Sequence, residues 1–114
     1  MISSKNRFHL RGSLNYVYKK GTTVRTESVS LRYVDARQED FRLAVVVSKK
    51  VSKSAVVRNR IRRRIYEIVR LHRKEAGKPW PTDMIITVFD DRAAAVPSPE
   101  LTATIRNLLQ KSGF

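Results

Sequence analysis

The segment from residue 49 to residue 74 constrains the fold of this chain more than any other. Within it, five residues recur at steps of four, four, three and four, the spacing of one face of an α-helix: Val57, Ile61, Ile65, Ile68 and His72. Ser54 is the predicted N-cap, and Gly77 followed by Pro79 is the predicted stop. Such a stripe needs an apolar surface to cover it, so we expect the helix to pack against a second layer.

The opposite side of this predicted helix is basic and is not balanced by acidic residues. Between Lys49 and Lys74 the chain has eleven Lys or Arg residues and one acidic residue, Glu67, so that this run carries +10 of the formal net charge of +14. Helix faces that are merely solvated usually mix charge signs, which makes a solvated face the weaker interpretation. Guanidinium groups match phosphate oxygens in a bidentate geometry. The run therefore favours a polyanionic partner, nucleic acid first and an anionic membrane surface second.

Length and composition limit the class of protein further. The 114 residues predict a single domain over residues 1–114, in which the basic residues 1–12 form a flexible arm. The chain has no cysteine, which fits a reducing compartment, and no apolar run approaches the roughly 18 residues that span a bilayer. The N-terminus lacks the apolar core of a signal peptide. We therefore expect a soluble, cytoplasmic protein without a membrane partner.

Changes in hydrophobic periodicity predict the order of the elements. In chain order these are a helix over residues 13–20, one or two strands over 22–34, a strand over 41–48, the basic helix, a strand over 84–89 and a helix over 98–112. The polar residues 35–40 predict a hairpin turn between the strands on either side of them. Residues 41–48 are nearly all apolar, so we expect this strand at the centre of the sheet.

The strand–helix–strand unit over residues 41–89 predicts two parallel strands, because a helical crossover returns the chain in the same direction. Together with the other elements, it predicts the α+β fold class. We expect a two-layer sandwich in which helices pack on one sheet.

The chain offers little for catalysis or metal binding of its own. Its two histidines are His9, in the predicted arm, and His72, which continues the apolar stripe and is expected to be packed. Metal-dependent nucleases hold their ions with clustered carboxylates, whereas Asp90 and Asp91 are better explained as a polar turn that ends a strand. Paired-histidine cleavage of RNA also lacks well-placed partners. We therefore predict no catalytic residue and no metal site within the protein.

Two motifs in this chain resemble those of a known family. The segment Val45-Val46-Val47-Ser48-Lys49-Lys50, followed by Val57-Arg58-Asn59-Arg60-Ile61-Arg62-Arg63, resembles the signature of the bacterial ribonuclease P protein component. Residues 14–18, followed by Lys20-Gly21-Thr22, are similar to the first helix of that family and its exit. The resemblance implies the fold α-β-β-β-α-β-α, with a βαβ crossover through the arginine helix that is left-handed, against the general right-handed rule.

The same resemblance implies a function. The chain would be the protein subunit of ribonuclease P, which binds ribonuclease P RNA and the 5′ leader of precursor tRNA and assists endonucleolytic removal of that leader. The RNA would carry the catalysis, with magnesium at the RNA active site, and no obligate protein partner is implied. Carried over by position, the residues that face the catalytic RNA are Lys49, Lys50, Lys53, Arg58, Asn59, Arg60, Arg62, Arg63 and Arg70.

The leader-binding cleft that the resemblance implies would be lined by Leu14, Tyr18, Ser30 and Arg32. Leu14 and Arg32 depart from the family, because relatives often have aromatic residues at both positions. Stacking on leader bases would then depend mainly on Tyr18, and Arg32 would hold the RNA backbone or stack its guanidinium plane. Core packing is the alternative role for Leu14 and for Tyr18.

Two other functions fit parts of the pattern. A plain RNA- or DNA-binding protein, such as a ribosomal protein, would use the basic helix but would not need a second, partly apolar cleft. A membrane-surface protein would use a basic amphipathic helix whose apolar stripe is exposed. The strand–helix–strand context predicts instead that the stripe is buried on the sheet.

Overall fold

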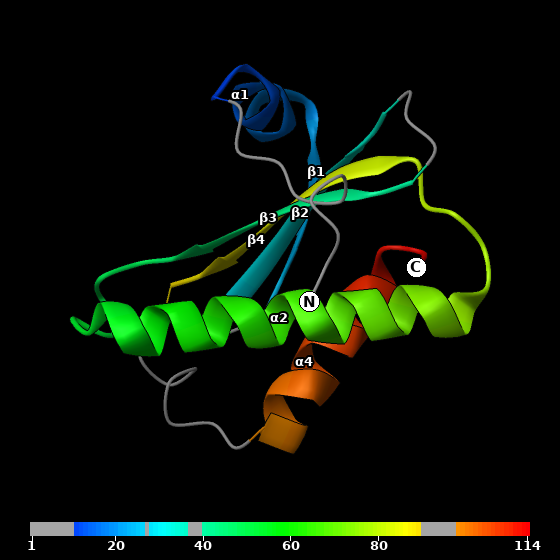
Figure 1. Cartoon of the computed structure of the whole chain (residues 1–114). Coiled ribbons are helices and arrows are strands. Elements are labelled where there is room, and N and C mark those ends of the chain that lie inside the picture. Colours follow the sequence, from blue (N-terminus) through cyan, green and yellow to red (C-terminus); the bar gives the residue numbers. More distant parts are fainter. Residues whose placement is uncertain (1–10, 27, 37–39, 90–97) are drawn as a thin grey trace.

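The computed structural model describes residues 11–26, 28–36, 40–89 and 98–114 as one sheet with helices on both of its faces (Figure 1). The elements are, in chain order, α1 (Arg11–Lys20), β1 (Thr22–Arg25), β2 (Val29–Asp35), β3 (Arg42–Val47), α2 (Ala55–Ala76), β4 (Thr82–Val88) and α4 (Ser98–Lys111). The α+β class and the order α-β-β-β-α-β-α agree with the prediction. No helix within the described ranges is long and apolar enough to span a membrane.

The four strands lie in the order β1-β2-β4-β3. β1 pairs with β2 and β2 pairs with β4 in antiparallel orientation, whereas β3 and β4 are parallel. The parallel pair is joined through α2, which confirms the predicted strand–helix–strand unit. The left-handed sense of this crossover stays a prediction.

Two predictions about the strands are wrong. The strands on either side of residues 35–40 do not form a hairpin with each other, because β4 lies between β2 and β3. For the same reason β3 is at an edge of the sheet and not at its centre. Its apolar sequence has another cause: Leu43 and Val45 are buried in the main core, and Ala44 is buried on the opposite face against Val17 of α1. An edge strand that is covered on both faces has the hydrophobic pattern of a central strand.

The stretch from Thr22 to Val34 forms two strands joined by a tight turn. The Thr26 backbone N–H donates to the Val29 carbonyl oxygen at 2.8 Å, and the Val29 N–H donates to the Thr26 hydroxyl oxygen at 3.2 Å. These bonds close the turn and let β1 pair with β2. The three strands before α2 that the family resemblance implies are therefore present.

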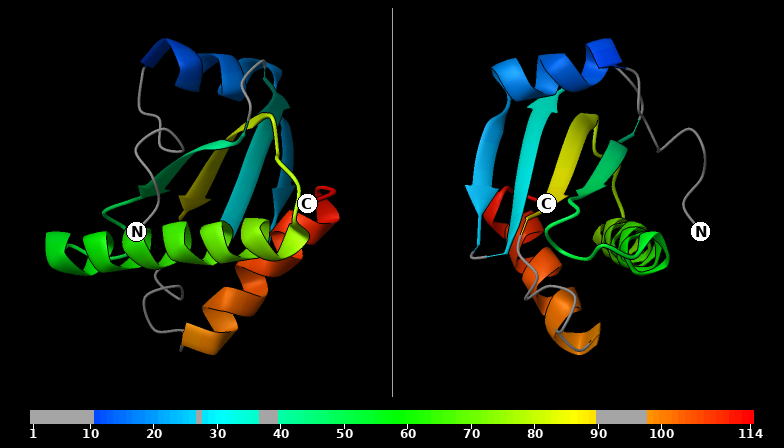
Figure 2. Two further views of the ribbon diagram at one scale, coloured as in Figure 1. Left: turned by 45° about the vertical axis from the view of Figure 1, so that its right-hand side comes forward. Right: turned by 90° about the vertical axis from the view of Figure 1, so that its left-hand side faces the viewer.

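The helices cover the two faces of the sheet unequally. α2 and α4 lie on one face and α1 lies on the other (Figure 1, Figure 2). The main core fills the space between the sheet and α2 with α4, and it includes Val29, Leu31, Leu43, Val45, Met84, Ile86, Ile65, Val69, Ile105 and Leu109. On the opposite face the described side chains form a smaller apolar cluster between α1 and the sheet, made by Val17, Ala44 and Ile85. The two-layer sandwich thus has a partial third layer that leaves part of this face open.

α2 is the amphipathic helix that the spacing predicts. The Ser54 hydroxyl oxygen accepts a hydrogen bond from the Val57 backbone N–H at 3.3 Å, and Gly77 ends the helix with φ 71°. The buried residues of α2 are Ile61, Ile65, Ile68, Val69 and His72. Because this stripe is sealed inside the fold, it is not available to insert into a membrane surface.

α1 begins at Arg11, before the predicted N-cap Ser13. Arg11 and Gly12, which the sequence assigns to the flexible arm, are therefore helical, and the rest of the predicted arm lies outside the described residues. Gly and Ser are weak helix formers, so local preference places the start too late. Val17 is fully buried against the sheet, and this tertiary contact offsets the weak preference.

His72 is packed, as the sequence predicts. Its ring centroid lies 5.8 Å from that of Trp80, and its Nε2 lies 3.2 Å from the backbone oxygen of Phe114. Trp80 also contacts Phe41 at 5.7 Å and Phe114 at 5.1 Å between ring centroids. These rings join the C-terminal end of α2 to the start of β3, to the segment before β4 and to the residues after α4.

Candidate nucleic-acid interface

The N-terminal half of α2 presents guanidinium groups that are not neutralised. Arg60, Arg63 and Arg64 are exposed, and none of the three has a hydrogen bond or an ion pair with a described residue. They lie on two successive turns of the same helix, so their guanidinium groups stay close together. The other side of the helix is buried, which fixes this charged side toward solvent. An anionic ligand would relieve their mutual repulsion. Arg64 is absent from the predicted interface, whose residues follow from the family resemblance by position; its place in the arginine run was the signal for it.

Two neighbouring arginines are held in place by short-range contacts. Arg58 donates from Nη1 to the backbone oxygen of Ser52 at 2.9 Å. Arg62 donates to the Asn59 side-chain oxygen, one turn earlier on the same helix. Neither bond involves an acidic residue, so both guanidinium groups keep their full positive charge. The two hydrogen bonds orient the guanidinium groups of Arg58 and Arg62 but do not neutralise their charge.

The segment before α2 adds three lysines to this surface. Val51 is buried and anchors the segment, while Lys49, Lys50 and Lys53 are exposed. The Arg58–Ser52 hydrogen bond ties the segment to the first turns of α2. We call the resulting group the basic surface: Lys49, Lys50, Lys53, Arg58, Asn59, Arg60, Arg62, Arg63 and Arg64.

Arg70, which the resemblance also assigns to the RNA-facing set, differs from the residues of the basic surface. It donates from Nε to Glu67 Oε2 at 3.1 Å, and a second guanidinium nitrogen pairs with Glu67 Oε1. This hydrogen-bonded pair raises the pKa of Arg70 and lowers the pKa of Glu67. The charge of Arg70 is therefore compensated within the helix.

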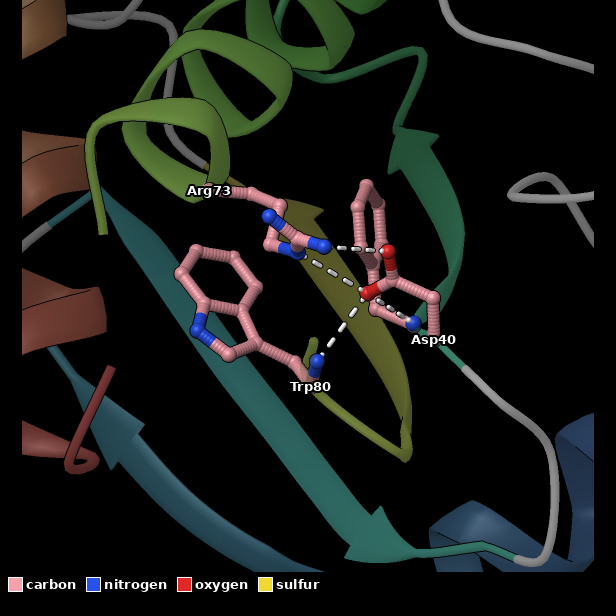
Figure 3. A network of polar contacts seen from close by, with 4 residues as sticks. Asp40, Arg73 and Trp80 are labelled. Atoms are coloured by element: carbon pink, nitrogen blue, oxygen red, sulfur yellow. Dashed lines mark hydrogen bonds and ion pairs between the residues drawn. The ribbon is translucent and has the colours of Figure 1, made fainter. Parts of the chain in front are cut away.

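Arg73 is withdrawn from the interface by a polar network at the C-terminal end of α2 (Figure 3). Asp40 Oδ1 accepts hydrogen bonds from the Phe41 N–H at 2.8 Å, the Trp80 N–H at 3.0 Å and Arg73 Nε at 3.1 Å, and Oδ2 lies 2.9 Å from Arg73 Nη2. Burial alone would raise the pKa of Asp40, but these hydrogen bonds outweigh it and lower the pKa. The network therefore fixes α2 to the start of β3 and to the segment before β4.

A second surface lies on the other face of the sheet. Ser30 of β2, Thr87 of β4 and Val46 of β3 are in register, and all three point away from the main core. Val46 is 39% exposed, while Ser30 and Thr87 are half-buried. The Arg25 guanidinium carbon lies 5.0 Å from the centroid of the Phe89 ring at the end of this row. We call Arg25, Ser30, Val46, Thr87 and Phe89 the open face.

The four residues predicted to line the leader cleft lie in different surroundings. Ser30 belongs to the open face, and Tyr18 is 48% exposed on α1, which lies over the same side of the sheet (Figure 2). This exposure argues against core packing as the role of Tyr18. The Leu14 side chain lies outside the described part of the chain. Arg32 is in β2, but its guanidinium is directed at the protein: Nε donates to the Val17 carbonyl oxygen at 2.9 Å.

Acidic clusters that could hold a metal ion are absent from the described ranges, which contain no group of three or more His, Asp or Glu side chains close enough to do so. The pair Asp90 and Asp91 and the histidine His9 lie outside these ranges. One buried carboxylate, Asp83, is engaged by Arg42, whose Nε donates to Asp83 Oδ1 at 2.8 Å. This hydrogen bond raises the pKa of Arg42.

Comparison with known proteins gives the same family throughout. The family described as Ribonuclease P matches residues 2–113. The chain is 33% identical over 111 residues to the ribonuclease P protein component of Roseiflexus castenholzii, covering 96% of this chain and 88% of that protein. It is 34% identical over 116 residues to the ribonuclease P protein component of a Pseudanabaena species, covering 98% and 95%.

Solved structures agree in fold. The RNase P protein of Staphylococcus aureus superposes with a TM-score of 0.83 at 24% identity, covering 94% of each chain. That of Thermotoga maritima superposes with a TM-score of 0.78 at 23% identity, covering 92% of this chain and 96% of its own. The chain therefore belongs to the family of ribonuclease P protein components, the protein subunits of a ribonucleoprotein endoribonuclease.

Proposed function

We propose that this chain binds ribonuclease P RNA through the basic surface and the 5′ leader of precursor tRNA through the open face and α1. The observation that carries the first half is the group of exposed arginines, Arg60, Arg63 and Arg64, without partners among the described residues. Backbone phosphates supply the missing negative charge, and guanidinium forks suit them. The buried stripe of α2 holds these groups on a rigid support.

The leader assignment is supported by the chemistry of the open face. Its central row is partly apolar and offers the hydroxyl groups of Ser30 and Thr87, and Tyr18 adds an exposed aromatic ring from α1. Single-stranded RNA binds to surfaces of this kind by stacking its bases on aromatic rings. The open face lies on the opposite side of the sheet from α2, so both RNA molecules can bind at the same time. A plain RNA-binding protein such as a ribosomal protein does not need this second surface.

Hydrolysis is assigned to the RNA partner. The magnesium ions that the family resemblance implies would lie at the RNA active site, and the protein residues named above bind and orient the two RNA molecules. We also propose that the protein acts in the cytoplasm and needs no obligate protein partner.

Reconstitution tests the proposal. The protein is added to a bacterial ribonuclease P RNA at low magnesium, and removal of the leader from a precursor tRNA is measured. We expect cleavage to depend on the protein and to be lost when Arg60, Arg63 and Arg64 are all changed to Ala. A double Lys78→Ala, Lys111→Ala variant, which removes exposed charge away from the basic surface, should retain cleavage. Equal loss in both variants would show that only net charge matters.

The leader is tested separately with Tyr18→Ala. Losing one stacked base costs about 1–3 kcal/mol, so precursor tRNA should bind roughly 5- to 150-fold more weakly to the reconstituted ribonucleoprotein. Mature tRNA, which has no leader, should bind as before. Equal losses for precursor and mature tRNA would remove the support for a leader site at α1.

A further inference from the structure

Arg32 makes an unusual set of contacts at the junction between α1 and the sheet. It extends from β2 on the side that α1 covers. Its Nε donates to the Val17 carbonyl oxygen at 2.9 Å, and its two terminal nitrogens donate to the Tyr18 carbonyl oxygen and to the Thr23 hydroxyl oxygen. All three nitrogens of the guanidinium are therefore bonded to this chain, and two of them are bonded to the last turn of α1.

The last turn of a helix is where such a group has the largest effect. The final carbonyl groups of a helix have no partner within the helix, and they form the negative end of its dipole. Lys19 and Lys20 lie in the same turn, but both are exposed. Arg32 supplies from another element a donor for the Tyr18 carbonyl oxygen, a second donor for the Val17 carbonyl oxygen and a positive charge. It thus acts as a C-terminal cap for α1.

The backbone at this junction leaves little freedom. The Gly21 N–H donates to the Val17 carbonyl oxygen at 2.8 Å. A Cβ atom at Gly21 would lie 2.5 Å from that oxygen and 3.0 Å from the Arg32 Cγ. The aliphatic part of Arg32 therefore occupies the space that a side chain at position 21 would need. This close fit sets where α1 leaves the sheet.

The described side chains of α1 make few other contacts with the sheet. Among its described side chains, at residues 16–20, only Val17 is buried, and it joins a cluster with Ala44 and Ile85. Tyr16 and Tyr18 on either side are 53% and 48% exposed. Among the described residues, Val17 and Arg32 hold the last turn of α1, and with it Tyr18, against the sheet.

We infer that Arg32 is a positioning residue, which holds the last turn of α1 and the Tyr18 ring in place for RNA and does not itself bind RNA phosphate. This role differs from the one that its position in the cleft suggests, where an arginine would hold the RNA backbone. The test by RNA binding rests on the proposed function. The test of the α1 contacts by hydrogen exchange does not.

The structural measurement is amide hydrogen exchange of the free, full-length protein. Arg32→Met keeps the aliphatic stem beside Gly21 and removes the three donors. Losing hydrogen bonds from a charged group should speed exchange in residues 17–21 by about tenfold or more, with exchange in β4 unchanged. Thr23→Val removes one acceptor of Arg32 and keeps its charge, and it should speed exchange of the same residues to a smaller extent.

Arg25→Met is the matched control for charge. It removes an arginine from the same side of the same sheet, but Arg25 contacts Phe89. Exchange in α1 should be unchanged in this variant. Arg32→Lys keeps the charge of Arg32 with a single donor group in place of the planar fork, and it should speed α1 exchange almost as much as Arg32→Met does.

The binding measurement is the salt dependence of precursor tRNA affinity in the reconstituted ribonucleoprotein. A lost phosphate contact to a single strand lowers the log–log slope by about 0.7. For Arg32→Met we expect weaker binding with an unchanged slope. A lower slope with unchanged α1 exchange would overturn the inference, since Arg32 would then be a phosphate contact, and no change in either quantity would overturn it as well.

The remaining outcome separates this inference from the proposed function. If Arg32→Met speeds α1 exchange and leaves precursor binding unchanged, Tyr18→Ala decides between two readings. Weaker precursor binding in Tyr18→Ala would overturn the link between Arg32 and RNA binding. Unchanged binding in Tyr18→Ala would remove the leader assignment itself, and the cap on α1 would stand on the exchange data.

Discussion

The two halves of α2 contain the same kind of residue and use it differently. In the N-terminal half, Arg60, Arg63 and Arg64 are exposed and have no partner among the described residues. In the C-terminal half, Arg70 pairs with Glu67 and Arg73 pairs with Asp40. Charge counted along the sequence therefore overstates the charge that a ligand meets. Of the two halves of α2, only the N-terminal one has guanidinium groups that no acidic side chain among the described residues already neutralises.

The C-terminal half is neutralised because it is also where α2 joins the rest of the fold. Asp40 comes from the segment before β3 and binds both Arg73 and the Trp80 backbone. Glu75 pairs with Arg106 of α4 across the interface between the two helices. The helix thus docks through one half and presents the other to its ligand.

The largest effect on RNA binding is expected at the N-terminal half of α2. Changing Arg60, Arg63 and Arg64 together to Ala should lower the log–log salt slope of binding to ribonuclease P RNA by about two to three, since each lost phosphate contact contributes about 0.7–0.9. Titrations over a range of salt concentrations measure this slope. The matched control is Arg70→Ala, in which the lost charge is already paired, and its slope should change by less than one contact. Equal changes per arginine in the two variants would contradict the difference between the halves.

At the C-terminal half the expected effect is on stability. Asp40→Asn removes the charge that accepts hydrogen bonds from Arg73, Trp80 and Phe41, and it should lower the free energy of unfolding by about 1–3 kcal/mol at neutral pH. Folding lowers the pKa of Asp40 from its usual 3.8. The ionised group therefore stabilises the fold above that pH, and its contribution is lost as the pH falls through the folded-state pKa.

Urea unfolding at neutral pH and at a pH well below 3.8 tests this. The gap in stability between the native chain and Asp40→Asn should shrink at the lower pH. A gap that stays constant would mean that the charge of Asp40 is not what matters.

The smallest effect is expected where the two halves meet. Glu67→Gln leaves Arg70 without its ion pair and adds one available cation beside the basic surface. RNA binding should tighten slightly, and the salt slope should rise by no more than about 0.9. The same titrations measure it. A weaker complex would show that Glu67 itself has a role in binding.

Local features of the fold were predictable from the sequence, and non-local ones were not. The stripe of α2 and its ends at Ser54 and Gly77 follow from helical spacing and capping, which depend only on neighbouring residues. The place of β3 at the edge of the sheet does not. Its two apolar faces are covered by different helices, one of them more than twenty residues before it in the chain, and this arrangement looks the same in sequence as a central strand.

The candidate site divides in the same way. The basic surface was predictable because its residues lie close together in sequence, in the first turns of α2 and in the segment just before it; Arg64 was missed. The open face was not, because it is assembled from register between β1, β2, β4 and β3. The role of Arg32 depends on which carbonyl groups lie opposite it, and its bonded partner Val17 is fifteen residues away.

The amphipathic helix with arginines on one side follows from the amino-acid sequence, because helical period and charge are properties of adjacent residues. The partner of Arg70, Glu67, lies one turn earlier in the same helix. The three-dimensional fold, by contrast, decided that Arg73 is neutralised, since its partner Asp40 lies 33 residues away. It likewise decided that Arg32 is bonded to α1. Distances through space between residues far apart in the chain are set by packing, and packing depends on several segments of the chain at once.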